Sequence, residues 1–386
     1  MHGDEHHHQC RTGSVSAGQG RTVGVMTNLL GGGPGTGMID WDLAVTTALR
    51  LLRPGPEVSR KEAFAAVAQL RELSVAAERH VATVTHLEPA ASTEPVAVVD
   101  RPRWVRENVN GFQTLLDPLI DRLQARSKQE PSPLVAAVGA RLAGVQIGTL
   151  LAFLSAKVLG QYELFGTGGR LLLVAPNIVH VEQELRVEPR DFRLWVCLHE
   201  VTHRVQFSAV PWLGGYLRSE IDRFVDATDL DPASMLQRLR DTATALIGTA
   251  RGDEGVSLLD AVQTPEQREV LDRLTAVMSL LEGHADYVMD GVGEEVVPTV
   301  RTIRDRFDRR RAGAGPLDQL LRRLLGLDVK MKQYAEGAAF VRGVVDRVGM
   351  DGFNHVWTSP DTLPTRAEIN DPAGWVARVH PTALEA

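Results

Sequence analysis

One segment of the sequence combines residue types and spacing that suit metal chemistry. Residues 199–203 read His-Glu-Val-Thr-His, which matches the H-E-x-x-H pattern of zinc enzymes. Residues four apart lie on the same face of a helix, so His199 and His203 can present two imidazoles to one metal ion. Glu200 can reach a water molecule bound to that metal. The segment therefore predicts a zinc hydrolase site that needs a third ligand and keeps one position open for water.

The residues around this motif favour a helix over about 190–208. Apolar residues recur there at helical spacing: Leu194, Leu198, Val201 and Val205. A neighbouring stripe contains both histidines: Trp195, His199, His203 and Gln206. Pro189 and Asp191 suit the start of a helix, and Pro211 suits its end. We therefore expect both histidines to lie beside a buried face, where a ligand belongs.

The third ligand is expected on a later helix. Gln206 and Ala209 stand where the metzincin class has Gly and His, so that class is excluded. Glu282 and Asp286 are four residues apart, and Asp286 could accept the free ring N–H of a ligating histidine. His284 is a rival ligand, but it lies about 200° around the helix from Glu282, so both cannot face the metal. Periodicity does not decide between them, whereas the pairing with Asp286 favours Glu282.

These residues predict hydrolysis of an amide bond. Zinc lowers the pKa of a bound water toward neutrality, and Glu200 would take the proton and pass it to the leaving amine. The developing oxyanion needs a further donor. Tyr287 and Tyr334 are the candidates, and Lys332 and His355 are weaker ones.

Several segments together resemble a bacterial family of zincin-like proteins. Its members are labelled as hydrolases, as zinc-dependent metalloproteases or as associated with deazaflavin coenzyme biosynthesis. The resemblance covers about residues 39–380, and the first two of four segments are the specific ones: HEVTHRVQF (199–207), LEGHADYVMD (281–290), KMKQYAEGAAFV (330–341) and GMDGFNHVWTSPDTLPTRAEINDP (349–372). It implies a zincin-like α+β fold with the gluzincin ligand set His199, His203 and Glu282, and Glu200 as the base. No segment reads as a deazaflavin-binding motif.

The whole-chain composition is that of an ordinary globular protein. The chain has 386 residues, of which 44% are hydrophobic and 24% charged, and its formal net charge is −7. This charge argues against a nucleic-acid partner. The two cysteines, Cys10 and Cys197, predict no disulfide framework, and Cys197 is expected to be a packed thiol.

The sequence predicts a soluble, cytoplasmic protein with no membrane partner. The N-terminus lacks the apolar stretch of a signal peptide. The most lipid-like segment, residues 142–156, is uncharged for only 15 residues, which is too short for a membrane span. We expect this segment to be a buried helix.

Two parts are expected along the chain. Residues 1–38 are rich in Gly, Ser and His and predict a disordered tail, whose His6-His7-His8 run could bind metal adventitiously. Residues 39–386 predict one domain, with a helical part over about 39–160 and a metal-site part over about 161–386.

Further helices are expected near 41–52, 60–85, 103–126, 132–160, 216–229, 233–250, 265–291, 298–312, 316–325 and 330–348. Residues 86–100 predict a loop. The clearest strand is 170–177, with a possible extended continuation over 178–181. Its edge could pair with an extended peptide.

Together these expected elements predict an α+β protein that is predominantly α-helical, with a small sheet preceding the HExxH helix. Its expected function is that of a narrow-specificity intracellular zinc metallopeptidase acting on a peptide or protein substrate. Two alternatives stay open: a zinc-binding but non-catalytic scaffold or partner-binding protein, and a metal-free helical interaction protein. The sequence does not predict the oligomeric state.

Overall fold

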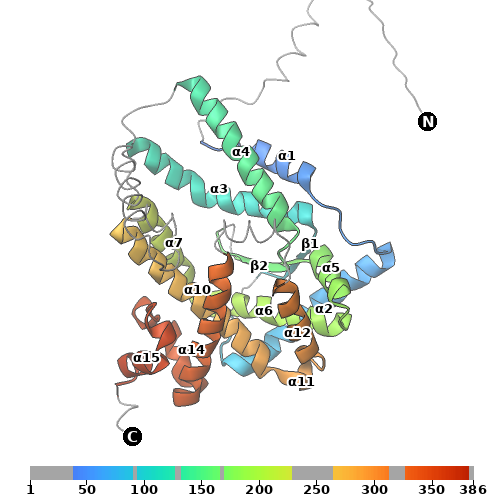
Figure 1. Ribbon diagram of the computed structural model, residues 1–386, viewed down its shortest axis with the longest axis vertical. Helices are drawn as coiled ribbons and strands as arrows, with labels where there is room; N and C mark the ends of the chain where they lie inside the picture. Colours follow the sequence, from blue (N-terminus) through green and yellow to red (C-terminus); the bar gives the residue numbers. More distant parts are fainter. Residues whose placement is uncertain are drawn as a thin grey trace, which may run out of the picture. The chain divides into compact units, whose positions relative to one another are not determined.

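A three-stranded sheet lies among helices that make up most of the chain (Figure 1). The computed structural model describes residues 38–89, 94–126, 132–165, 169–227, 264–312 and 327–381. For residues 123, 126, 311, 312 and 327–334 it describes the backbone only. The predicted tail, apart from Met38, and the helices predicted near 233–250 and 316–325 lie outside the described residues.

The helices are α1 (Trp41–Leu51), α2 (Arg60–Thr85), α3 (Arg101–Arg126), α4 (Pro133–Ser155), α5 (Ala175–Leu185), α6 (Pro189–Ala209), α7 (Pro211–Asp226), α10 (Pro265–Gly291), α11 (Gly293–Val296), α12 (Val300–Ala312), α14 (Leu327–Phe353) and α15 (Pro372–Val379). Three short 3₁₀ helices lie between α14 and α15: η1 (Asn354–Trp357), η2 (Pro360–Thr362) and η3 (Glu368–Asn370). The strands are β1 (Ala97–Val99), β2 (Gly160–Glu163) and β3 (Arg170–Val174). The mostly helical α+β class predicted from the sequence is confirmed.

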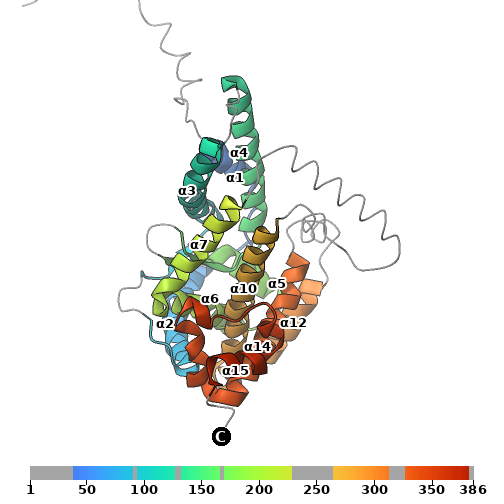
Figure 2. The ribbon, with the colours of Figure 1, turned by 90° about the vertical axis from the view of Figure 1, so that its left-hand side faces the viewer.

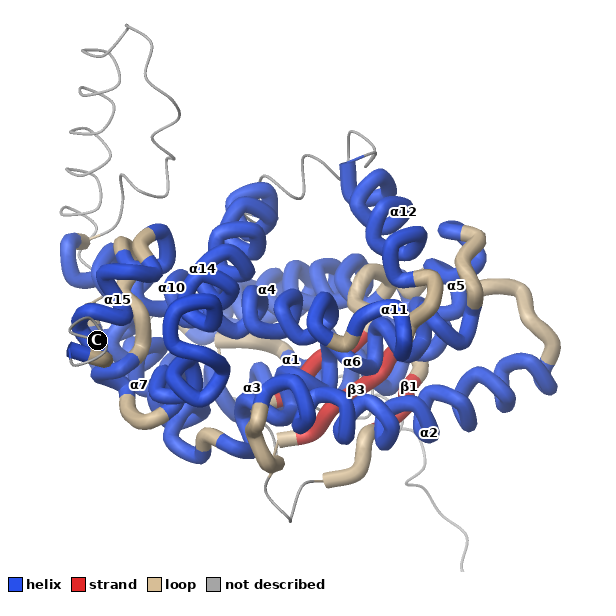
Figure 3. Tube along the Cα trace, turned by 90° about the horizontal axis from the view of Figure 1, so that it is seen from below, coloured by secondary structure: helices blue, strands red, loops and turns tan. Residues whose placement is uncertain are grey.

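The sheet has the order β1-β3-β2. Figure 3 labels the neighbouring strands β1 and β3. β3 pairs in parallel with β1, with Val98 opposite Leu173, and antiparallel with β2, with Gln161 opposite Leu172. The expected strand at residue 170 is thus confirmed, but it is the middle strand. The prediction that its edge could pair with a peptide was wrong, because both edges are already paired.

Two other predictions near the sheet were wrong. The stretch expected to be loop contains β1, which exists because it pairs with β3. The extended continuation over 178–181 is instead part of helix α5, which begins directly after β3. Pro176 lies in the first turn of α5, where its missing N–H costs nothing. Ile178, Val181 and Leu185 then face the core at helical spacing.

β3 separates two hydrophobic clusters because alternate side chains of a strand point to opposite faces. Leu171 and Leu173 belong to a cluster formed with α2, α5 and α6. Leu172 and Val174 belong to a second cluster, formed with α1, α3 and α4. A third cluster joins α7, α10, α14 and the C-terminal segment.

Helix α6 lies between the first and third clusters and contacts α2, α5, α7, α10, α12, β2 and β3. The Glu188 side chain caps its first turn by accepting from the Asp191 backbone N–H, and Pro189 is its first residue. The predicted apolar stripe from Leu194 to Val205 is buried, as expected. Cys197 is a buried free thiol, and burial raises its pKa. α6 therefore forms a rigid support for the two histidines.

Helix α4 is more exposed than its composition predicts. Gly144 and Gly148 lie against α1, where an added Cβ would come within 2.4 Å of the carbonyl oxygens of Asp40 and Ala44. The first turns extend past α1 and α3 (Figures 1 and 2). Large apolar residues there are exposed: Leu134, Val135, Val138 and Leu142.

The expectation of a buried helix was wrong for α4, because its small residues face α1 while most of its large ones, Leu151 excepted, are exposed. Of the described helices, α4 alone has the length and composition to cross a membrane. These two features alone are weak evidence of a membrane span.

Candidate metal centre

The two histidines of the motif point to a common position from one face of α6. Their Nε2 atoms are 3.2 Å apart, and their ring planes are nearly perpendicular. His199 is 27% exposed and His203 is 14% exposed at the side chain. The four-residue spacing thus produces the convergence expected from a helix.

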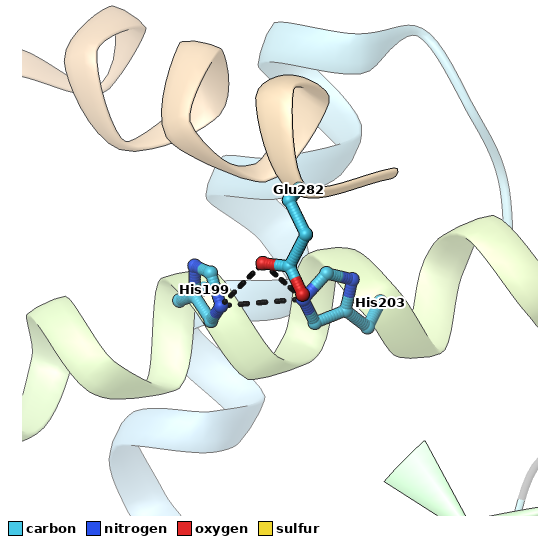
Figure 4. Close-up of side chains that lie close together, drawn as sticks. All are labelled: His199, His203 and Glu282. Carbon is cyan, nitrogen blue, oxygen red and sulfur yellow. Dashed lines mark hydrogen bonds and ion pairs between the residues drawn. The ribbon is translucent and has the colours of Figure 1, made fainter. Parts of the chain in front are cut away.

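Glu282 comes to the same position from α10. Its Oε2 lies 3.5 Å from Nε2 of His199 and 3.6 Å from Nε2 of His203. Figure 4 shows the carboxylate reaching down from α10 toward both rings. The structure therefore brings together His199, His203 and Glu282, the three residues predicted to be metal ligands.

The geometry of these three groups fits a tetrahedral zinc ion. Ligand atoms at about 2.1 Å from a tetrahedral metal lie about 3.4 Å from one another. The separations here are 3.2, 3.5 and 3.6 Å. Two imidazoles and one carboxylate are also a donor set of catalytic zinc sites, with a fourth position left for water.

The contact between α10 and α14 sets the position of Glu282. Gly283, the next residue, lies against Gly337 of α14, and an added Cβ on Gly283 would be 2.1 Å from the Gly337 carbonyl carbon. A Cβ on Gly337 would be 1.9 Å from the Ser279 carbonyl oxygen. Only glycine permits this approach of two helix backbones. The Gly283–Gly337 contact therefore lets α10 sit close to α14 at the level of Glu282.

Glu200 is buried beside the three groups, 7% exposed. Burial raises its pKa to about 7; His203 opposes this rise, and Glu282 adds to it. The carboxyl group packs against β2, where an added Cβ on Gly160 would lie 2.5 Å from the Glu200 Cδ. A glycine inside a strand often marks such a close approach. Glu200 thus has a fixed position and a pKa near neutrality, as a general base requires.

The charges at the site favour a protonated His203 in the metal-free protein. Burial lowers the pKa of His203, but Glu282 and Glu200 raise it more, so the pKa rises to about 9. A metal ion would replace this proton as the partner of Glu282.

His284, the rival ligand, lies on the other flank of α10. It is fully buried, and its ring packs against Phe353 and Trp357. Burial lowers its pKa to about 3, and His203 contributes to the shift. Its Nδ1 contacts Nε2 of Gln206 at 3.1 Å. The structure therefore does not place His284 with the three convergent groups.

The remaining predicted residues are placed less directly. Asp286 is half-buried one turn after Glu282, but the partner of Nδ1 of His203 is Gln206. The expectation that Asp286 accepts the free ring N–H of a ligating histidine stays a prediction. Tyr287 packs against the third cluster and is about 140° around α10 from Glu282.

The structure describes the side chain of one further candidate donor, His355. His355 stacks on His380 in the C-terminal segment. The side chains of Tyr334 and Lys332 lie outside the described residues.

Sequence reasoning did not assign roles to Gln206, Gly160 and Gly337. Gln206 could have been found from its position three residues after His203 on the same stripe. The glycines could have been found as isolated glycines in a strand and in a helix, which often mark close approach.

Comparison with known proteins assigns the family. The sequence pattern of the zincin-like metallopeptidases matches residues 39–376. The chain belongs to the zincin-like metallopeptidase family. This membership implies a bound metal, usually zinc, and hydrolytic activity.

A solved structure is similar to this chain over most of its length. The chain resembles a protein from Chloroflexus aurantiacus described as a "putative hydrolase with a novel fold". The two are 34% identical, the match covers 88% of this chain and 98% of the other, and the TM-score is 0.64. No curated protein matches the chain.

Proposed function

We propose that this zincin-like protein is a zinc-dependent peptidase of narrow specificity, with Glu200 as its general base. The observation that carries the proposal is the fixed, buried carboxyl of Glu200 beside three convergent ligand groups. A site that only held a metal for structure would have no use for a base. His199, His203 and Glu282 would hold the zinc ion.

The residues divide the chemistry between them. Zinc, when bound, supplies an open position for water and lowers the pKa of that water. Glu200 takes a proton from the attacking water and gives it to the leaving amine. Its pKa near 7 suits both transfers close to neutral pH. His203 and Glu282 are only 14% and 17% exposed, so a slender peptide segment suits the site better than a folded surface.

Strand β2 supports a peptide as the substrate. It is the outer strand of the described sheet on one side, and Gly160 at its start packs against Glu200. A peptide that adds to a free strand edge is held by backbone hydrogen bonds. A peptide added to β2 would run past the base.

The test compares the full chain with its Glu200→Gln variant on a diverse peptide library, with zinc content measured for both. The variant should keep its zinc and lose hydrolysis by about 10²–10⁴-fold. The zinc content of a His199→Ala, His203→Ala double variant measures how much zinc the His-rich tail binds, and this amount is subtracted. Full zinc occupancy without any cleavage by the wild type would favour the non-catalytic scaffold.

A further inference from the structure

A buried amide joins the metal-site helix to α10. Gln206 is fully buried and lies three residues after His203 on α6. Its Oε1 is 2.9 Å from Nδ1 of His203. Its Nε2 is 2.9 Å from the carbonyl oxygen of Leu281 and 3.1 Å from Nδ1 of His284. The contacts to Leu281 and His284 are buried, and the contact to His203 is partly buried.

The partners of Gln206 decide which way its amide group faces. The Leu281 carbonyl can only accept a hydrogen bond, so the group that faces it must be the NH₂. The second N–H of this NH₂ points to His284. The reversed amide would put two acceptor oxygens against each other in a buried space, which is costly. The amide oxygen of Gln206 must therefore face His203.

This orientation fixes the proton of His203. The amide oxygen can only accept, so Nδ1 of His203 must be the donor. In a neutral imidazole a proton on Nδ1 leaves the lone pair on Nε2. Nε2 is the atom that lies 3.2 Å from His199 and 3.6 Å from Glu282. The lone pair thus faces the position where the ligand groups converge.

We propose that Gln206 is a positioning residue that fixes the ring orientation and tautomer of His203 for metal binding. It is not itself a ligand. Because Leu281 directly precedes Glu282, the same amide also ties the position of His203 to the backbone that carries the third ligand group. The inference rests on the proposed zinc function and explains how ligands from two helices keep their register.

The main test removes the hydrogen bonds of Gln206 but keeps its volume. Gln206→Met in the full chain should weaken zinc binding about 10–100-fold, as loss of a partner of a ligating histidine usually does. Thr202→Val is the matched control, since Thr202 is equally buried on α6 and its hydroxyl donates to the Leu198 carbonyl oxygen. Zinc affinity is measured by competition with a chelator, and the absorption spectrum of the cobalt-substituted protein reports the ligand geometry.

A second variant separates positioning from stability. Gln206→Glu keeps an acceptor for His203 but loses the donor to Leu281 and buries a carboxyl group. It should melt below Gln206→Met in the metal-free form, yet bind zinc within about threefold of the wild type. A purely structural role would instead make zinc affinity follow the melting temperature.

The outcomes distinguish the inference from the function on which it rests. If the wild type binds no more zinc than its His-rich tail holds, both the inference and the proposed function are overturned. A wild type that binds zinc, with Gln206→Met equal to it in affinity and cobalt spectrum, overturns the inference alone. If Gln206→Met does not fold, a loss above tenfold in Gln206→Glu, with Thr202→Val unchanged, overturns it as well.

Discussion

The glycine contact between α10 and α14 predicts a linked loss of stability and zinc affinity. In a Gly337→Ala variant the new Cβ would lie 1.9 Å from the Ser279 carbonyl oxygen. Ordinary contact begins near 3.4 Å, so the two helices must separate by about 1.5 Å (3.4 minus 1.9). The Cβ is fixed by the backbone of α14 and the oxygen belongs to the backbone of α10, so no side-chain rotation can relieve the clash.

The expected magnitudes follow from this separation. Overpacking of a core typically costs about 1–3 kcal/mol, and a backbone clash belongs at the upper end. At roughly 2 °C per kcal/mol, the melting temperature of the metal-free protein should fall by about 6 °C. Glu282 would move with α10 by far more than the ~0.2 Å that a zinc bond tolerates, so zinc affinity should fall at least about tenfold.

The assay is thermal unfolding of the metal-free protein together with chelator competition for zinc. Gly139→Ala is the control, because Gly139 lies in helix α4 and an added Cβ would meet no described atom within 4 Å beyond its own stretch of helix. This change should be neutral or stabilise by up to about 1 kcal/mol. A Gly337→Ala variant with wild-type melting temperature and zinc affinity would refute the idea that this contact positions Glu282.

Three further predictions concern the same site. The pKa of His203 is about 9 in the folded protein, above its usual 6.5. Protonated His203 therefore stabilises the metal-free fold, and this contribution is complete below about pH 6.5 and lost above about pH 9. Zinc must displace that proton, so chelator competition should show affinity falling as pH drops below 9, by up to about tenfold per unit. Glu282→Ala should lose far more zinc affinity than Asp286→Ala, and equal losses would contradict the ligand assignment. Gly160→Ala should displace Glu200 by about 1 Å and lower hydrolysis by up to about 10²-fold at unchanged zinc content; unchanged hydrolysis would show that this contact does not hold the base.

The sequence predicted the parts of this protein that depend on local periodicity. Helices α6 and α10 were expected almost to the residue, because long amphipathic helices leave a strong apolar pattern. The choice of Glu282 over His284 agrees with their placement, since Asp286 marks the same face as Glu282. The meeting of α6 and α10 was implied only by the need for a third ligand.

What the sequence did not predict depends on contacts between distant segments. β1 has three residues and β2 has four, too few for a periodic signal, and both exist because β3 offers partners. The role of Gln206 depends on a hydrogen bond to the backbone carbonyl of Leu281, 75 residues later. Every residue has such a carbonyl, so the residue type at this position gives no sign of the contact. The exposure of α4 likewise reflects which neighbours pack on it, not its own composition.

The order of the strands in the sheet has a consequence for how the chain folds. β2 and β3 are near neighbours in sequence and can form a hairpin early. β1 must wait, because Ala97 pairs with Leu172, 75 residues later (172 minus 97). At about 5–20 residues per second, synthesis of that stretch takes roughly 4–15 s. During this time α3 and α4 can form, while β1 has no partner. A strand of only three residues offers little edge on which other chains could aggregate, so its short length protects the nascent protein.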